Sequence, residues 1–127
     1  MKRSFLAMAL LAFASASAPV HAQGQIDILQ IWQNFIASGV AATECGSVEP
    51  ASRQKFLSNL TAVSIRATQA LQQRQPSAAP AAVASEMKLA GDGIHDKVEA
   101  EIKQNECSSP KIQPLISMYK MHSEMNF

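Results

Sequence analysis

The sequence predicts an all-α protein, a small up-down-up-down four-helix bundle closed by one disulfide after a cleaved signal peptide. Apolar residues recur every three or four positions from Ile26 onward, and the alternation typical of strands appears at no useful length. Prolines divide this periodic region into four segments with short connections, which favour antiparallel neighbours. Two cysteines, Cys45 and Cys107, close the first and third segments.

The four helices are expected where an apolar stripe coincides with boundary signals. Gly46 can end the first helix in a left-handed conformation, and Pro50 suits the first turn of the second. Gly91 and Gly93 interrupt a stripe that stays in phase across them, so we expect one third helix with a soft point. The predicted helices cover residues 25–45, 50–75, 81–107 and 111–126.

The amino terminus has the three parts of a secretory signal peptide. Two basic residues follow Met1, and the apolar run after them spans only about half of a roughly 30 Å hydrocarbon core. Small residues then offer a cleavage site between Ala22 and Gln23. We therefore expect residues 1–22 to be removed and residues 23–127 to form one domain, periplasmic or secreted.

Loss of the signal peptide changes the formal net charge from +1 to −1, because two basic and no acidic residues leave with it. A near-neutral domain without a basic run argues against nucleic acid as a partner. No later apolar run is long enough to span a membrane, and no cysteine near the cleavage junction could carry a lipid. We expect no stable membrane anchor in the mature form.

The two cysteines predict a structural disulfide, since cysteine pairs in exported chains are commonly bridged. They form neither a C-x-x-C redox motif nor a C-x-x-C-H haem attachment. In an up-down bundle the first and third helices run parallel, so Cys45 and Cys107 would meet at one end. Aromatic residues make up only 6% of the chain, which predicts a core mainly of aliphatic side chains and methionine.

The last predicted helix carries the most informative polar pattern. Four side chains share a face of about 100°, turned roughly 100° from the apolar stripe: Met118, Met121, His122 and Met125. Thioethers and imidazole are soft ligands that select Cu(I). From Met118 to Met125, eight residues in all, the segment resembles the methionine- and histidine-rich segments of bacterial copper-binding proteins. The alternative is a widened apolar face or an adaptable patch that meets a partner subunit.

A second polar pattern lies on the third predicted helix. Asp92, His95 and Glu99 share one face at helical spacing and could hold a divalent ion. Three common polar residues at this spacing arise easily by chance, so we expect a solvated face. Asp96 is expected to point elsewhere, since adjacent residues on a helix do not face each other.

No sequence motif indicates catalysis, because the chain has no G-x-S-x-G elbow and no glycine-rich phosphate loop after a strand. We expect a binding or interaction protein, not an enzyme, with a protein partner or self-association and no resident cofactor. The chain is similar to acid-stress periplasmic chaperones in size, helical content and long-range disulfide. That resemblance implies apolar surface exposed by acid. A copper-binding protein of the same compartment is the alternative function, and a secreted factor aimed at other cells fits the same features.

Overall fold

The computed structural model describes residues 27–46 and 48–127. Within these ranges the chain forms no strand. The predicted signal peptide, residues 1–22, and the Ala22–Gln23 cleavage site lie outside the described residues. The helices are α1 (Ile28–Glu44), α2 (Pro50–Arg74), α3 (Pro80–Asn105) and α4 (Gln113–Glu124). The prediction of an all-helical protein with four helices is confirmed.

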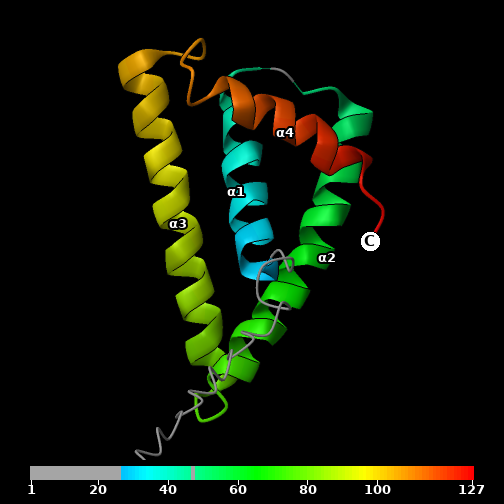
Figure 1. The fold of residues 1–127 in the computed structure, drawn as a ribbon, viewed down its shortest axis with the longest axis vertical. Helices are drawn as coiled ribbons and strands as arrows, with labels where there is room; N and C mark the ends of the chain where they lie inside the picture. Colours follow the sequence, from blue (N-terminus) through cyan, green and yellow to red (C-terminus); the bar gives the residue numbers. More distant parts are fainter. Residues whose placement is uncertain (1–26, 47) are drawn as a thin grey trace, which may run out of the picture.

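The arrangement differs from the predicted up-down-up-down order in its last step. Figure 1 shows α1, α2 and α3 alternating in direction, with α4 crossing the upper parts of α1 and α2. Helix α1 packs against all three other helices, whereas in the part described no Cα atom of α3 lies within 8 Å of one of α4. With 12 residues, α4 is only about 18 Å long, so it bridges two helices and does not return along α3.

The helix ends follow local chemistry. At the start of α1, the side chain of Asp27 accepts a hydrogen bond from the backbone N–H of Leu29 at 3.0 Å. Gly46 has φ 69°, the left-handed conformation that favours glycine after a helix. Helix α3 ends two residues earlier than predicted because Glu106, with φ 63°, turns the chain toward the disulfide.

The disulfide joins Cys45 and Cys107, whose Cα atoms lie 5.8 Å apart. This confirms the predicted pairing and places the carboxyl ends of α1 and α3 side by side. A small buried cluster beside it contains Ala41, Val98 and Ile112. Ile112 precedes α4 directly, so this cluster also fixes the point from which α4 departs.

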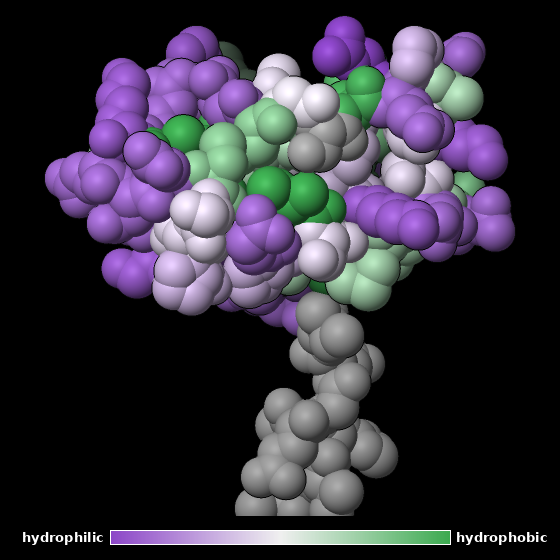
Figure 2. Space-filling view, turned by 90° about the horizontal axis from the view of Figure 1, so that it is seen from above, coloured by the Kyte–Doolittle hydropathy of each residue, from purple (hydrophilic) through white to green (hydrophobic). Residues whose placement is uncertain are grey.

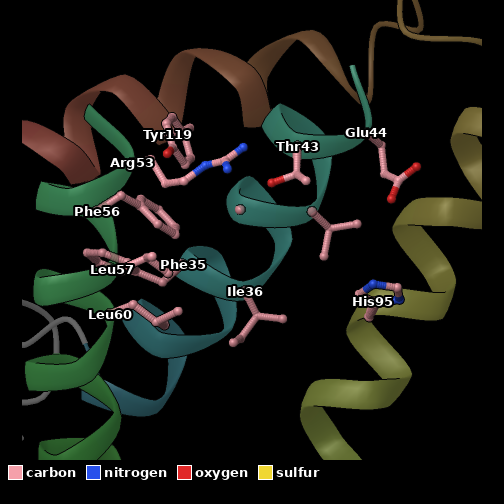
Figure 3. Close-up of a pocket in the computed structure, with 12 residues that line it drawn as sticks. Phe35, Ile36, Thr43, Glu44, Arg53, Phe56, Leu57, Leu60, His95 and Tyr119 are labelled. Carbon is pink, nitrogen blue, oxygen red and sulfur yellow. The ribbon is translucent and has the colours of Figure 1, made fainter. Parts of the chain in front are cut away.

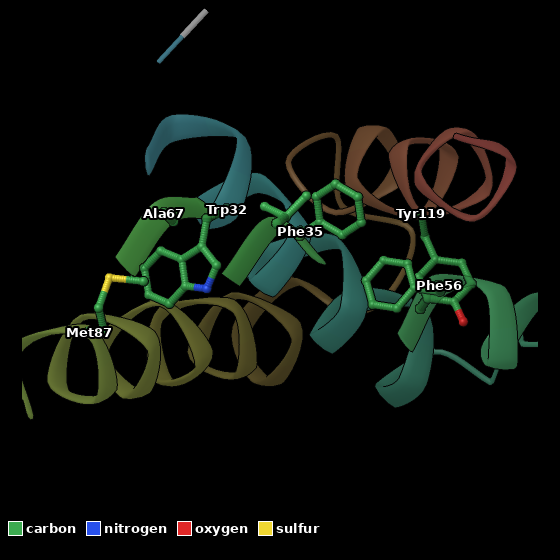
Figure 4. Close-up of a cluster of buried hydrophobic side chains, with 8 residues drawn as sticks. Trp32, Phe35, Phe56, Ala67, Met87 and Tyr119 are labelled. Carbon is green, nitrogen blue, oxygen red and sulfur yellow. The ribbon is translucent and has the colours of Figure 1, made fainter. Parts of the chain in front are cut away.

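Aromatic side chains are concentrated in the main core. Its buried members are Trp32, Phe35, Ala42, Phe56, Val63, Ala67, Met87 and Tyr119. Figure 4 shows the thioether of Met87 beside the indole of Trp32 and the rings of Phe56 and Tyr119 lying together. Half of this cluster is aromatic, but eight of the twelve buried hydrophobic side chains in the described residues are aliphatic or methionine, as the composition predicts. Three of the four buried aromatic rings, those of Phe35, Phe56 and Tyr119, come from α1, α2 and α4 and pack together.

At the end of the molecule where α4 crosses, hydrophobic side chains gather in the middle of the surface between hydrophilic side chains on both sides (Figure 2). None of the helices in the described ranges combines the length and the hydropathy needed to cross a membrane.

Candidate functional site

A pocket of about 330 Å³ opens along α1, between α2 and α3 (Figure 3). We call it the central groove. Its apolar lining comes from α1 and α2: Phe35, Ile36, Val40, Phe56, Leu57 and Leu60. Five polar side chains complete the lining: Thr43, Glu44, Arg53, His95 and Tyr119. A mostly apolar cavity of a few hundred Å³ with a few polar groups is the usual form of a small-molecule site.

A close approach of α1 and α2 shapes the groove. A Cβ atom added at Gly39 would lie 3.1 Å from both Cε1 and Cζ of Phe56, tighter than ordinary side-chain contacts. The Phe56 ring therefore rests against the backbone of α1, and glycine is the residue that leaves room for it. This contact sets the wall between the groove and the core.

Tyr119 brings an unpaired donor to the groove. Its side chain is 5% exposed, and its ring stacks on Phe56 with centroids 4.2 Å apart. The Tyr119 hydroxyl is buried without a hydrogen-bond partner in the described part of the chain, which costs about 1–3 kcal/mol for such a group. Burial raises the pKa of the phenol, and the charge of Arg53 partly opposes this rise. The hydroxyl stays protonated at neutral pH. A hydrogen bond from it to an acceptor would remove the free-energy cost of burying it unpaired.

Arg53 is the cation of the groove. Its side chain is exposed and forms no ion pair with any described residue. Figure 3 shows Arg53 reaching across the upper groove toward Thr43, with Glu44 and His95 on the side of α3. Sequence analysis identified neither Arg53 nor Tyr119 as a site residue, because only the crossing of α4 brings them together.

The structure separates the members of the predicted copper face. His122 is 7% exposed, its ring stacks on Phe35 with centroids 3.8 Å apart, and its Nδ1 lies 2.9 Å from Ser38 Oγ. Met121 and Met125 are 58% and 40% exposed, on the solvent side of α4. The imidazole would have to leave the core to join them. Cu(I) binding at Met118, Met121, His122 and Met125 stays a prediction.

The burial of His122 has an electrostatic consequence. Desolvation lowers the pKa of its imidazole below the usual value of 6.5. Its backbone carbonyl and that of Met125 both accept hydrogen bonds from the side-chain amide of Asn59, at 2.8 and 2.7 Å. The end of α4 is thus held against α2 by polar contacts and against α1 by the stacked imidazole.

The polar pattern on α3 differs from its prediction in one member. His95 Nδ1 lies 3.9 Å from Asp96 Oδ1, and His95 Nε2 lies 3.8 Å from Glu99 Oε1. Asp92 instead pairs with Lys88 at 2.6 Å. The expectation that Asp96 points away from His95 is wrong, since the two side chains approach each other. The ligand atoms of His95, Asp96 and Glu99 lie within 4.8 Å of one another, but exposed acidic groups are common without a bound ion.

No protein-family model, no curated protein and no solved structure matches this chain.

Proposed function

We propose that this protein is an exported binding protein that holds a small apolar molecule in the central groove. The observation that carries the proposal is an open pocket whose apolar lining comes from α1 and α2 and which holds only a few polar groups. Its volume of about 330 Å³ lies within the range of small-molecule sites.

Export is part of the proposal. The charged, apolar and small-residue order of residues 1–22 supports secretion to the periplasm or the medium. The disulfide between Cys45 and Cys107 supports an oxidising compartment. Mass spectrometry of the protein isolated from its own compartment is expected to give a chain that begins at Gln23. A chain that retains residues 1–22 would contradict export by cleavage.

A pair of matched variants on α2 tests binding in the groove. Leu57 and Ile65 are 51% and 55% exposed, but only Leu57 lines the groove. We expect Leu57→Asn to weaken the binding of decyl maltoside, a neutral amphiphile, about fivefold, because part of the apolar contact is lost. Ile65→Asn should leave the affinity unchanged. Titration calorimetry below the micelle concentration measures both, and equal weakening by the two variants would contradict the proposal.

Acid-triggered chaperone activity is a second candidate, favoured by the position of His122. The imidazole stacks on Phe35, and Phe127 packs edge-on against the same ring with its own ring 5.5 Å from the guanidinium of Arg66. Protonation of His122 would add a positive charge to this buried end of α4, where Arg66 is already cationic. We therefore expect α4 to loosen at acid pH and expose Phe35.

Two measurements test the chaperone candidate. Binding of an apolar fluorescent dye should rise between pH 7 and pH 5, and the protein should then suppress the aggregation of an unfolded client. His122→Gln should remove most of the rise, because glutamine does not titrate. Dye binding that stays constant over this pH range would eliminate the candidate.

A further inference from the structure

The upper end of the central groove presents two donors without acceptors. The buried hydroxyl of Tyr119 has no partner in the part of the chain that the structure describes, although buried polar groups are nearly always hydrogen-bonded. The guanidinium of Arg53 lines the same pocket and lies close enough for its charge to act on the phenol. An incoming oxygen atom with negative charge would satisfy both groups.

The charges around the groove determine which way such a ligand would lie in it. Arg53 comes from α2, whereas Glu44 and His95 stand on the side toward α3 (Figure 3). An anionic group near Glu44 would meet a like charge, and near Arg53 it would meet an opposite one. The apolar lining residues Ile36 and Leu60 then remain for the rest of the molecule.

From this arrangement we propose that the groove binds an amphiphile with a carboxylate head and an apolar tail, such as a medium-chain fatty acid. The carboxylate accepts hydrogen bonds from the Tyr119 hydroxyl and the Arg53 guanidinium, and the tail lies on the apolar lining. Hydrogen bonds between guanidinium and carboxylate are charge-assisted and stronger than neutral ones. This assignment rests on the proposed binding function and adds the chemical class of the ligand.

The covered position of the Tyr119 hydroxyl is compatible with binding. Arg53 beside it is exposed, and exposed side chains change rotamer within picoseconds to nanoseconds. The guanidinium can therefore move to meet a head group beside Tyr119. The ring of Tyr119 stays fixed by its stacking on Phe56, so the hydroxyl is oriented before the ligand arrives.

Tyr119 also borders a second pocket, of about 470 Å³, between the start of α2 and α4. Its lining includes Glu49, Ser52 and Lys120 and does not include Arg53. A carboxylate there would meet Glu49 as well as Lys120, and of the described lining residues one, Ile116, is aliphatic. Leu57 borders the central groove and not this second pocket, so a Leu57→Asn variant distinguishes the two locations.

The test compares three amphiphiles with the same decyl chain on the full-length disulfide-bonded protein. Calorimetry is run with decanoate, decyl maltoside and decyltrimethylammonium below their micelle concentrations. We expect decanoate to bind about tenfold more tightly than the neutral compound and the cationic compound to bind most weakly. Arg53→Gln and Tyr119→Phe should each lower the affinity for decanoate about three- to tenfold and leave that for decyl maltoside unchanged. Leu57→Asn should weaken both.

Lys55→Gln is the matched control, because it removes an exposed positive charge from α2 that does not line the groove. It should leave all three affinities unchanged. Equal binding of decanoate and decyl maltoside, or decanoate binding unaffected by Arg53→Gln and Tyr119→Phe, would overturn the carboxylate assignment while the proposed function stands. Failure of every amphiphile to bind would overturn both.

Discussion

Helix α1 is covered on two sides, and the two sides are built differently. Toward α2 and α4, the ring of Phe35 stacks on His122, the ring of Phe56 stacks on Tyr119, and the two phenylalanine rings meet at a tilt. Toward α3 the buried side chains carry no ring: they are Val83, Met87 and Val98. Helix α2 also buries three side chains, but it lies close to all three other helices, whereas α3 lies close to α1 and α2. Burial of apolar area is the main stabilising term in folding, so a helix with fewer packing partners depends more on other constraints.

Two such constraints attach α3. The disulfide fixes its carboxyl end to α1. In its middle, the indole of Trp32 lies against Gly91, where an added Cβ would be 3.5 Å from Cζ2. The helix runs unbroken through Gly91 and Gly93, which confirms the prediction of one helix. Helices α2 and α3 are of similar length and bury three side chains each, but α2 contributes a ring to the core and packs against α4, and α3 does neither.

Removal of the disulfide should have the largest effect on this comparison. Replacement of both Cys45 and Cys107 by serine is expected to lower the free energy of unfolding by about 4 kcal/mol, because the unfolded chain regains the entropy of a long open loop. Denaturant titration measures the loss. Hydrogen exchange should show that α3 loses protection before α1 and α2 do. Equal loss of protection in α2 and α3 would show that the two sides of α1 are not distinct.

Substitution of two glycines should change the free energy of unfolding by about 1 kcal/mol in opposite directions. Gly39→Ala should destabilise the protein by about 1 kcal/mol, because the new methyl group meets Phe56 at 3.1 Å and overpacking outweighs the gain in helix propensity. Gly93→Ala should stabilise it by about 0.5–1 kcal/mol, since nothing lies within 4 Å of the added atom. Thermal unfolding measures both. A stabilising Gly39→Ala would mean that α1 and α2 are not tightly packed.

The smallest expected effect is a pH dependence of stability that arises where α1 packs against α2 and α4. Because burial lowers the pKa of folded His122, the unfolded chain binds a proton more readily below pH 6.5. Stability should therefore fall as the pH decreases through this value and level off once folded His122 is itself protonated. Denaturant titration at several pH values measures this fall.

Matched histidine variants identify its source. His122→Gln should flatten the pH profile, whereas His95→Gln, at an exposed position on α3, should preserve it. If His95→Gln removes the pH dependence of stability instead, the pH-sensitive contact lies between α1 and α3 and the prediction is wrong.

The sequence predicts the helices and the disulfide because these depend on local or covalent features. Proline and glycine mark the helix ends within a few residues. The 3.6-residue spacing of apolar side chains indicates a helix whichever way the helices pack. His122 shows where this reasoning fails: at helical spacing it belongs with Met121 and Met125 as easily as with the core. Only its stacking on Phe35 decides between the two.

The amino-acid sequence by itself determines that this chain is all-helical, that its apolar stripes must pack together, and that Cys45 and Cys107 can join two helix ends. The tertiary structure alone decides that α4 crosses α1 and α2. The angle at which helices meet depends on how side chains from different helices interlock, and no local pattern encodes it. That crossing buries the Tyr119 hydroxyl without a partner beside Arg53 and thereby creates the site to which the proposed ligand binds.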